Sequence, residues 1–140
     1  MDYEIYSLEM EVRDHECDMA GMVNHAHFLH YLEHARFSFL REHGIDFQKF
    51  AQEGVALVAK RIEVDYIAPL HCTEKFTVAV QLQRLSPLRY VFMQEIHRRH
   101  DKRLILQARV IGTAINSQGR PQIPQELERL LTPCLQRVMA

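Results

Sequence analysis

The stretch from Asn24 to His43 reads NHAHFLHYLEHARFSFLREH and contains no proline or glycine. At about 100° of rotation per residue, its apolar side chains fill one broad arc of a helix. The members of that arc are Phe28, Leu29, Tyr31, Leu32, Ala35, Phe39 and Leu40. Asn24 suits the N-cap position and Gly44 the position that follows a helix, so both ends carry stop signals. We therefore predict one long, mostly buried helix.

The sequence on both sides of this helix has a period of two residues, which is typical of half-buried strands. Residues 4–13 form the first such segment. A short helix is expected over 46–52, and four further strands run from about residue 58 to 115. The side chains expected to face inward are Tyr6, Leu8, Met10 and Val12, then Val58, Ile62, Val64 and Tyr66, then Phe76, Val78, Val80 and Leu82, and finally Tyr90, Phe92 and Ile96.

The order of these elements is strand, long helix, four strands and a short terminal helix over 124–131. Strands joined by tight turns form an antiparallel meander, because parallel neighbours need crossover connections of a dozen residues or more. One largely apolar helix must then be buried against one face of the sheet. We predict an α+β fold: a five-stranded antiparallel sheet around one central helix, in a single domain over 1–140.

The composition indicates an ordinary globular protein. Lys and Arg number 17 against 18 Asp and Glu, a net charge of −1, so a grip on nucleic acid is poorly supported. The three cysteines have no C-x-x-C spacing, which argues against disulfides and a cysteine-built zinc site. With no signal peptide and no apolar run long enough for membrane insertion, we expect a cytoplasmic protein.

The densest chemical signal precedes the long helix, where residues 14–21 read DHECDMAG. Asp18 lies about six residues before the helix begins. A helix amino terminus has unpaired amide donors and partial positive charge, so it can stabilise a carbonyl oxygen that becomes negative during acyl transfer. A carboxylate beside it could attack that carbonyl or activate water. The alternative, that Asp18 is only a turn or capping residue, stays open.

The run DMAGMVNHAHF over 18–28 resembles the D-x-x-G-x-V-(N/Y)-(H/N/Y)-x-x-(Y/F) signature of hotdog-fold thioesterases, the 4-hydroxybenzoyl-CoA thioesterase-like group. The likeness continues through Gly44-Ile45, through 64–70, and through 119–124. Phe28 departs modestly from the pattern, since tyrosine is commoner there. The resemblance implies an antiparallel sheet wrapped round one long helix, in agreement with the periodicity.

The resemblance also implies roles for single residues. Asp18 matches the catalytic carboxylate, which is a nucleophile in some members and a general base in others. His25 matches the catalytic position whose backbone amide polarises the thioester carbonyl. Gly21 matches the glycine that turns the loop into the helix, and Asn24 matches a capping or substrate-facing position.

For substrate and assembly, the resemblance implies an acyl-CoA or acyl carrier protein thioester, hydrolysed without metal or cofactor. The site of such enzymes lies at a dimer interface, so a homodimer or homotetramer is expected. Lys60, Arg61 and Arg89 are candidates for binding the phosphates of the carrier. The alternative for Lys60 is a strand-end lysine whose stem lies along apolar surface, and the alternative for Arg61 and Arg89 is solvated charge on a polar face.

Two other functions remain open. His30-Tyr31-Leu32-Glu33-His34 spells H-x-x-E-H, a zinc-hydrolase pattern in which two histidines bind the metal and the glutamate activates water. A functional zinc site is disfavoured, because the sequence downstream is made of strands and offers no helical third ligand. The other alternative is a non-catalytic acyl-CoA or acyl-carrier binding module, which would be expected to lose the acid at Asp18.

Overall fold

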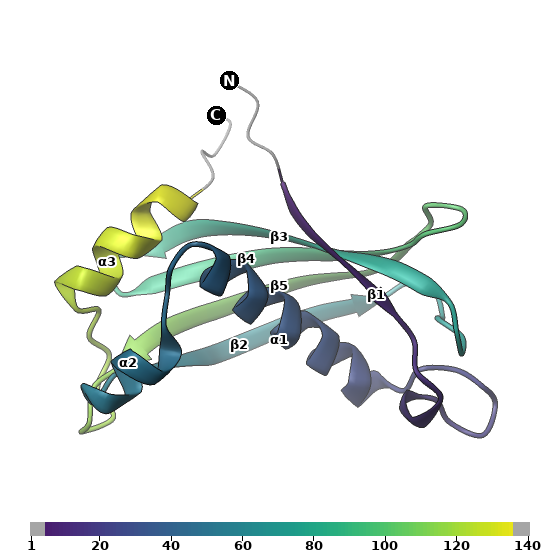
Figure 1. Cartoon of the computed structure of the whole chain (residues 1–140), viewed down its shortest axis with the longest axis horizontal. Helices are drawn as coiled ribbons and strands as arrows, with labels where there is room; N and C mark the ends of the chain where they lie inside the picture. The colour runs from purple at the N-terminus through teal and green to yellow at the C-terminus, as the bar shows by residue number, and fades with distance from the viewer. Residues whose placement is uncertain (1–4, 136–140) are drawn as a thin grey trace.

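The structure, a computed structural model, describes residues 5–135. Its strands are β1 (Tyr6–Glu11), β2 (Ala56–Tyr66), β3 (Lys75–Ser86), β4 (Arg89–Arg98) and β5 (Leu104–Ile115). Its α-helices are α1 (His25–Glu42), α2 (Phe47–Gln52) and α3 (Gln125–Leu131). The strands form one antiparallel sheet in the order β1-β3-β4-β5-β2, and α1 lies along the sheet (Figure 1). The predicted fold class is confirmed.

The expected meander is correct only for β3, β4 and β5. β2 pairs with β5 at the far edge of the sheet, and β1 rather than β2 pairs with β3. The segment 67–74 therefore connects β2, at one edge of the sheet, with β3, which lies next to the opposite edge strand. Alternation in a strand reports which face is buried but carries no information about the neighbouring strand, so the sequence pattern could not exclude this arrangement.

The inward faces of β1, β3 and β4 follow the predicted alternation closely, but Ile62 and Tyr66 of β2, which were predicted to face inward, are 42% and 43% exposed because β2 is an edge strand. Phe76, Val78, Val80 and Leu82 of β3 are completely buried, and so is Ile96 of β4. In β2 the pairing with β5 shifts between Ala59 and Arg61, which leaves Lys60 as the extra residue of a bulge. Because of this bulge, Leu57 and Ala59 rather than Val58 share a face with Ile62.

The long helix begins and ends where its signals predict. The Asn24 side chain accepts a hydrogen bond from the His27 amide at 3.1 Å, and Gly44 has a φ of +85°. The buried face contains six of the seven predicted residues, but Leu29 is 36% exposed and so was wrongly placed in the arc. Arg36, which the apolar pattern did not include, is buried instead.

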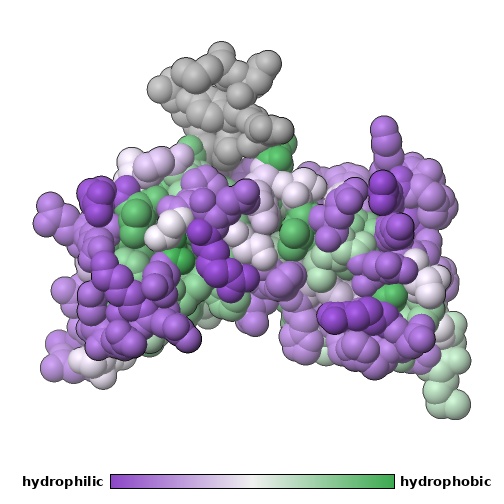
Figure 2. All heavy atoms as spheres, in the orientation of Figure 1, coloured by the Kyte–Doolittle hydropathy of each residue, from purple (hydrophilic) through white to green (hydrophobic). Residues whose placement is uncertain are grey.

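The surface of the described residues is mostly polar. Figure 2 shows charged and polar side chains over most of one face, with hydrophobic side chains in smaller patches between them. None of the helices in residues 5–135 has the length and apolar character needed to cross a membrane.

Candidate functional site

The loop before α1 folds back on itself, which carries Asp18 close to the start of the helix. Cys17 pairs with Val23 in an antiparallel bridge, and the Asp18 amide donates to the Met22 carbonyl at 2.8 Å. Gly21 makes this turn possible, because its φ is +77°, a conformation that other residues adopt only with strain. The tight turn ends one residue before the helix cap.

The side chain of Asp18 is exposed, and only one of its two carboxylate oxygens accepts hydrogen bonds from the described residues. Its Oδ1 accepts hydrogen bonds from the amides of Ala20 at 2.9 Å and Met22 at 3.1 Å. The turn role considered from the sequence is therefore present in the structure. Oδ2 accepts no hydrogen bond from residues 5–135, which leaves one oxygen of a fixed carboxylate available to a ligand or to water.

The amino terminus of α1, which directly follows the Asp18 turn, offers free donors. Asn24 occupies the cap and engages the His27 amide, whereas the amides of His25 and Ala26 have no partner within the described chain. The imidazole of His25 packs edge-on against the Tyr66 ring at 4.8 Å, and the Tyr66 hydroxyl donates to the His25 carbonyl at 3.3 Å. The end of β2 thus holds the helix start.

The crossing segment 67–74 holds the Asp18 loop from the other side. The Val23 amide donates to the Leu70 carbonyl at 2.9 Å, and the Cys72 amide donates to the Gly21 carbonyl at 3.0 Å. These main-chain bonds fix both sides of the turn. The unexpected strand order therefore has a local effect, because it brings the connection after β2 against the loop that carries the carboxylate.

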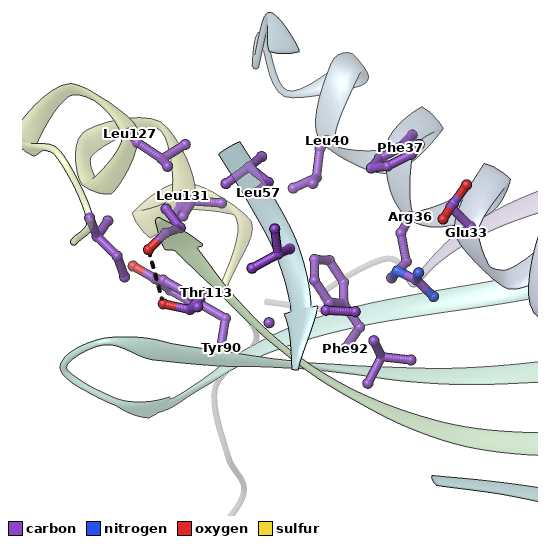
Figure 3. A pocket seen from close by; sticks show the side chains of 16 residues that line it. Glu33, Arg36, Phe37, Leu40, Leu57, Tyr90, Phe92, Thr113, Leu127 and Leu131 are labelled. Atoms are coloured by element: carbon purple, nitrogen blue, oxygen red, sulfur yellow. Dashed lines mark hydrogen bonds between the residues drawn. The ribbon is translucent and has the colours of Figure 1, made fainter. Parts of the chain in front are cut away.

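A cavity of about 110 Å³ lies at the opposite end of α1 from Asp18. Its walls are mainly apolar and include Phe37, Leu40, Leu57, Phe92, Val110 and Leu127. Figure 3 shows Arg36 reaching from α1 toward Phe92 at one end of this cavity, with Glu33 beside it. Asp18 does not line the cavity, so in a single chain this carboxylate and the apolar cavity are separate.

Residues 12–131 match the family model of the thioesterase-like superfamily. The chain belongs to this superfamily. It is 31% identical over 125 residues to a chloroplast acyl-acyl carrier protein thioesterase of Arabidopsis thaliana, covering 89% of this chain and 66% of that protein. It is 26% identical over 120 residues to a long-chain acyl-CoA thioesterase of Escherichia coli, covering 86% and 90%. The chain spans 66% and 62% of two plant relatives.

Solved structures share the fold of this thioesterase-like chain. A 1,4-dihydroxy-2-naphthoyl-CoA thioesterase from Synechocystis superposes with a TM-score of 0.84 at 23% identity, covering 91% of this chain and 96% of that one. The dynemicin thioesterase gives a TM-score of 0.83 at 26% identity, covering 96% and 100%. The family resemblance inferred from residues 18–28 is thus confirmed over most of the chain.

The three basic candidates of this thioesterase-like chain are not brought to Asp18 within one chain. Lys60 is exposed in the bulge of β2, and the neighbouring Arg61 pairs with Glu63 at 3.0 Å. Arg89 begins β4 at the end of the sheet where the cavity lies. Their phosphate-binding role stays a prediction, and the structure assigns them to the cavity end and the free edge of β2.

The H-x-x-E-H pattern gains no support from the geometry. His30 and His34 are exposed on α1, and His30 packs edge-on against His27 with ring centroids 5.5 Å apart. Among residues 5–135, no group of three or more His, Cys, Asp or Glu side chains is arranged to hold a metal ion. Cys17, another potential nucleophile, has its thiol directed to the Arg13 carbonyl at 3.8 Å.

Proposed function

We propose that this chain hydrolyses the thioester of an acyl-CoA or an acyl-acyl carrier protein to a free carboxylic acid and a thiol, with Asp18 driving the reaction. The observation that carries the proposal is the free Oδ2 of Asp18 on the tight turn that leads directly into α1, whose first amides are unpaired within the described residues. The names of the relatives, which include thioesterases of both carriers, support both substrate classes.

The chemistry follows from this arrangement. In this proposal the amides of His25 and Ala26 donate to the thioester carbonyl, whose oxygen gains negative charge as the acyl carbon is attacked. Asp18 either attacks that carbon, giving an anhydride that water then cleaves, or takes a proton from the attacking water. In both routes the carbon–sulfur bond breaks, the thiol leaves with a proton, and the water oxygen remains in the acid.

We further propose that two copies of the chain complete the site. β2 is an edge strand with exposed apolar side chains: Ile62 is 42% and Tyr66 43% exposed, and Ile67, directly after the strand, is 47% exposed. Such an edge tends to pair with another strand. An antiparallel, two-fold pairing of β2 with its copy would set the start of one β2, which lines the cavity, against the end of the other, which holds the partner's helix start.

In this pairing, the cavity of one protomer would lie close to the Asp18 carboxylate of the other, a proximity that a single chain lacks. The acyl group would enter the cavity of one protomer while its thioester meets Asp18 of the other. Lys60, Arg61 and Arg89 would then border the route of the carrier, and Gly21 and Asn24 would shape the reacting end. A homodimer is the smallest assembly with these properties, and a homotetramer of two such dimers retains them.

Thiol release from acyl-CoA thioesters tests the activity. The panel contains short, medium, long and aromatic acyl groups, and a parallel panel presents the same groups on acyl carrier protein. We expect turnover that is insensitive to chelator. Folded protein with no turnover on either carrier would reject the enzyme and favour the binding module, whereas activity lost on removing zinc and restored by adding it would favour the H-x-x-E-H alternative. Sedimentation at micromolar concentration should show a dimer or larger species.

A further inference from the structure

Arg36 is a buried cation in the apolar stripe of α1. It lies four residues after Leu32 and four before Leu40, both of which belong to the core, and it is only 8% exposed. Burial lowers the pKa of its guanidinium, while the nearby carboxylate of Glu33 partly offsets that effect. Burial of a charged group is costly unless partners compensate it. The partners of Arg36 therefore indicate whether it serves stability or ligand binding.

Only some of the hydrogen-bond donors of the Arg36 side chain have partners among the described residues. The Nη1 of Arg36 donates to the Gln94 Oε1 at 3.1 Å, and the Gln94 Nε2 donates to the Leu32 carbonyl at 3.0 Å. No carboxylate among residues 5–135 lies within ion-pair distance of the guanidinium, which has five donors. No fully buried side-chain nitrogen or oxygen of the described chain lacks a partner. The unused donors of Arg36 therefore retain accessible surface.

That surface faces the cavity. Arg36 is one of its lining residues, and Figure 3 shows the guanidinium projecting from α1 into the space beside Phe92. The guanidinium carbon lies 6.0 Å from the centre of the Phe92 ring. The rest of the wall is mainly apolar. A set of fixed hydrogen-bond donors in such a cavity selects a ligand that carries an acceptor at that point.

We propose that this cavity selects acyl groups bearing a neutral oxygen, a hydroxyl or keto group on the chain, and that Arg36 is the residue that recognises it. The inference rests on the proposed function and names the substrate class of that site. A neutral oxygen fits better than a carboxylate, because the carboxylate of Glu33 also borders the cavity near Arg36. A second anion in the same cavity would be repelled by Glu33.

The bond to Gln94 does not by itself explain Arg36. Gln94 is 1% exposed and is held by the Leu32 carbonyl, and a single neutral donor would satisfy its oxygen. A hydrophobic residue in place of a buried cation is often neutral or stabilising. The extra donors and the charge therefore point to a ligand rather than to stability.

The test compares matched pantetheine thioesters of ten-carbon acyl groups: unsubstituted, 3-hydroxy, 3-oxo, 10-hydroxy and 9-carboxynonanoyl, which ends in a carboxylate. We expect kcat/KM for at least one hydroxyl or keto compound to exceed that of the unsubstituted compound by about tenfold or more, as one added hydrogen bond to a charged donor supplies. In Arg36→Met that ratio should fall to about one, and in Arg36→Lys it should be intermediate. Arg41→Met, an exposed change on the same helix, should keep the ratio.

Binding of the corresponding pantetheine amides, which resist hydrolysis, separates this inference from the proposed function. Tighter binding of an oxygenated amide that disappears in Arg36→Met supports it even if no thioester is hydrolysed. Equal binding of plain and oxygenated amides, a preference for the carboxylate, or a preference that survives in a folded Arg36→Met protein would overturn it. If Arg36→Met fails to fold, Phe92→Leu, which alters the wall beside the guanidinium, must shift the preference.

Discussion

The hydroxyl of Tyr31 donates a hydrogen bond of 2.9 Å to the Oε1 of Glu16, two residues before Asp18. The same oxygen accepts the Arg13 amide at 2.8 Å, and Glu16 is only 5% exposed. Through this carboxylate, the middle of α1 is bonded to the base of the loop that carries the proposed catalytic group. Tyr31→Phe should lower the free energy of unfolding by about 1 kcal/mol. Urea unfolding measures it, and an unchanged midpoint would show that the bond contributes nothing.

The charge of Glu16 also predicts a pH dependence. Burial by itself raises the pKa of Glu16, but the bonds from Arg13 and Tyr31 outweigh it and bring the pKa below its ordinary value of 4.5. A lowered pKa in the folded state stabilises the protein above pH 4.5, and this contribution is lost as the pH falls through the folded-state pKa. The stability difference between the wild type and Glu16→Gln should therefore be full at pH 7 and shrink below pH 4.5. Glu11→Gln, at an exposed position, is the control.

Asp18→Asn is the sharpest test of the proposed catalytic carboxylate. An asparagine side chain still offers an oxygen to the amides of Ala20 and Met22, so the turn should persist. We expect kcat to fall by about 10² to 10⁴-fold with the melting temperature and oligomeric state unchanged. An Asp18→Asn protein that retains more than half of the wild-type kcat would remove Asp18 from the mechanism.

Mixing two inactive variants tests whether the site is shared between protomers. Asp18→Asn removes the carboxylate, and Val110→Phe fills part of the cavity. If the cavity of one chain serves the carboxylate of the other, each mixed dimer has one intact site. With random exchange, about a quarter of wild-type activity should return. Mixing that restores nothing, although sedimentation and tagged pull-down show exchanged dimers, would place the whole site in one chain.

We predict that Glu74 positions the Asp18 loop indirectly, through the segment 67–74. Its Oε1 accepts the His71 amide at 2.7 Å, and its Oε2 lies 3.3 Å from the His100 Nε2 and 3.7 Å from the Arg98 Nε. Glu74→Gln should cost about 1–2 kcal/mol of stability and lower kcat more than it raises KM, because segment 67–74 fixes the loop. The exposed Glu9→Gln is the matched control. A kcat equal to the wild type at full folding would refute the positioning role.

The sequence pattern predicted which face of a strand or helix is buried better than it predicted which strands pair with one another. Alternation identified the buried side of β3 and β4, and the apolar arc of α1 was correct apart from Leu29. The pairing of β2 with β5 depends on which distant strand completes the hydrogen bonding, and no local period reports that. The bulge at Lys60 is likewise visible only once the partner strand is known, and it explains why a lysine interrupts an otherwise apolar register.

In the candidate site too, the sequence predicted the residues that depend on local spacing and did not predict the one that depends on distant partners. Asp18 and the helix start could be inferred from local spacing and from the family signature, since both lie within a few residues of one another. Arg36 was missed because a lone arginine on a helix is usually exposed. Its spacing of four from Leu32 and Leu40 was the available signal. That signal becomes meaningful only when β4 supplies Phe92 and Gln94 around the side chain of Arg36.

The position of β2 also orders the assembly of the molecule. β3, β4 and β5 are joined by short hairpins and can form early, whereas β2 must wait for β5, about fifty residues further along the chain. In a single, unassembled protomer, amide hydrogens of β2 should accordingly exchange faster with solvent than those of β4. Until β2 docks, β5 presents a bare row of peptide groups to its surroundings. The chain is then most vulnerable to aggregation along β5, at an edge that the docked β2 covers in the finished protein.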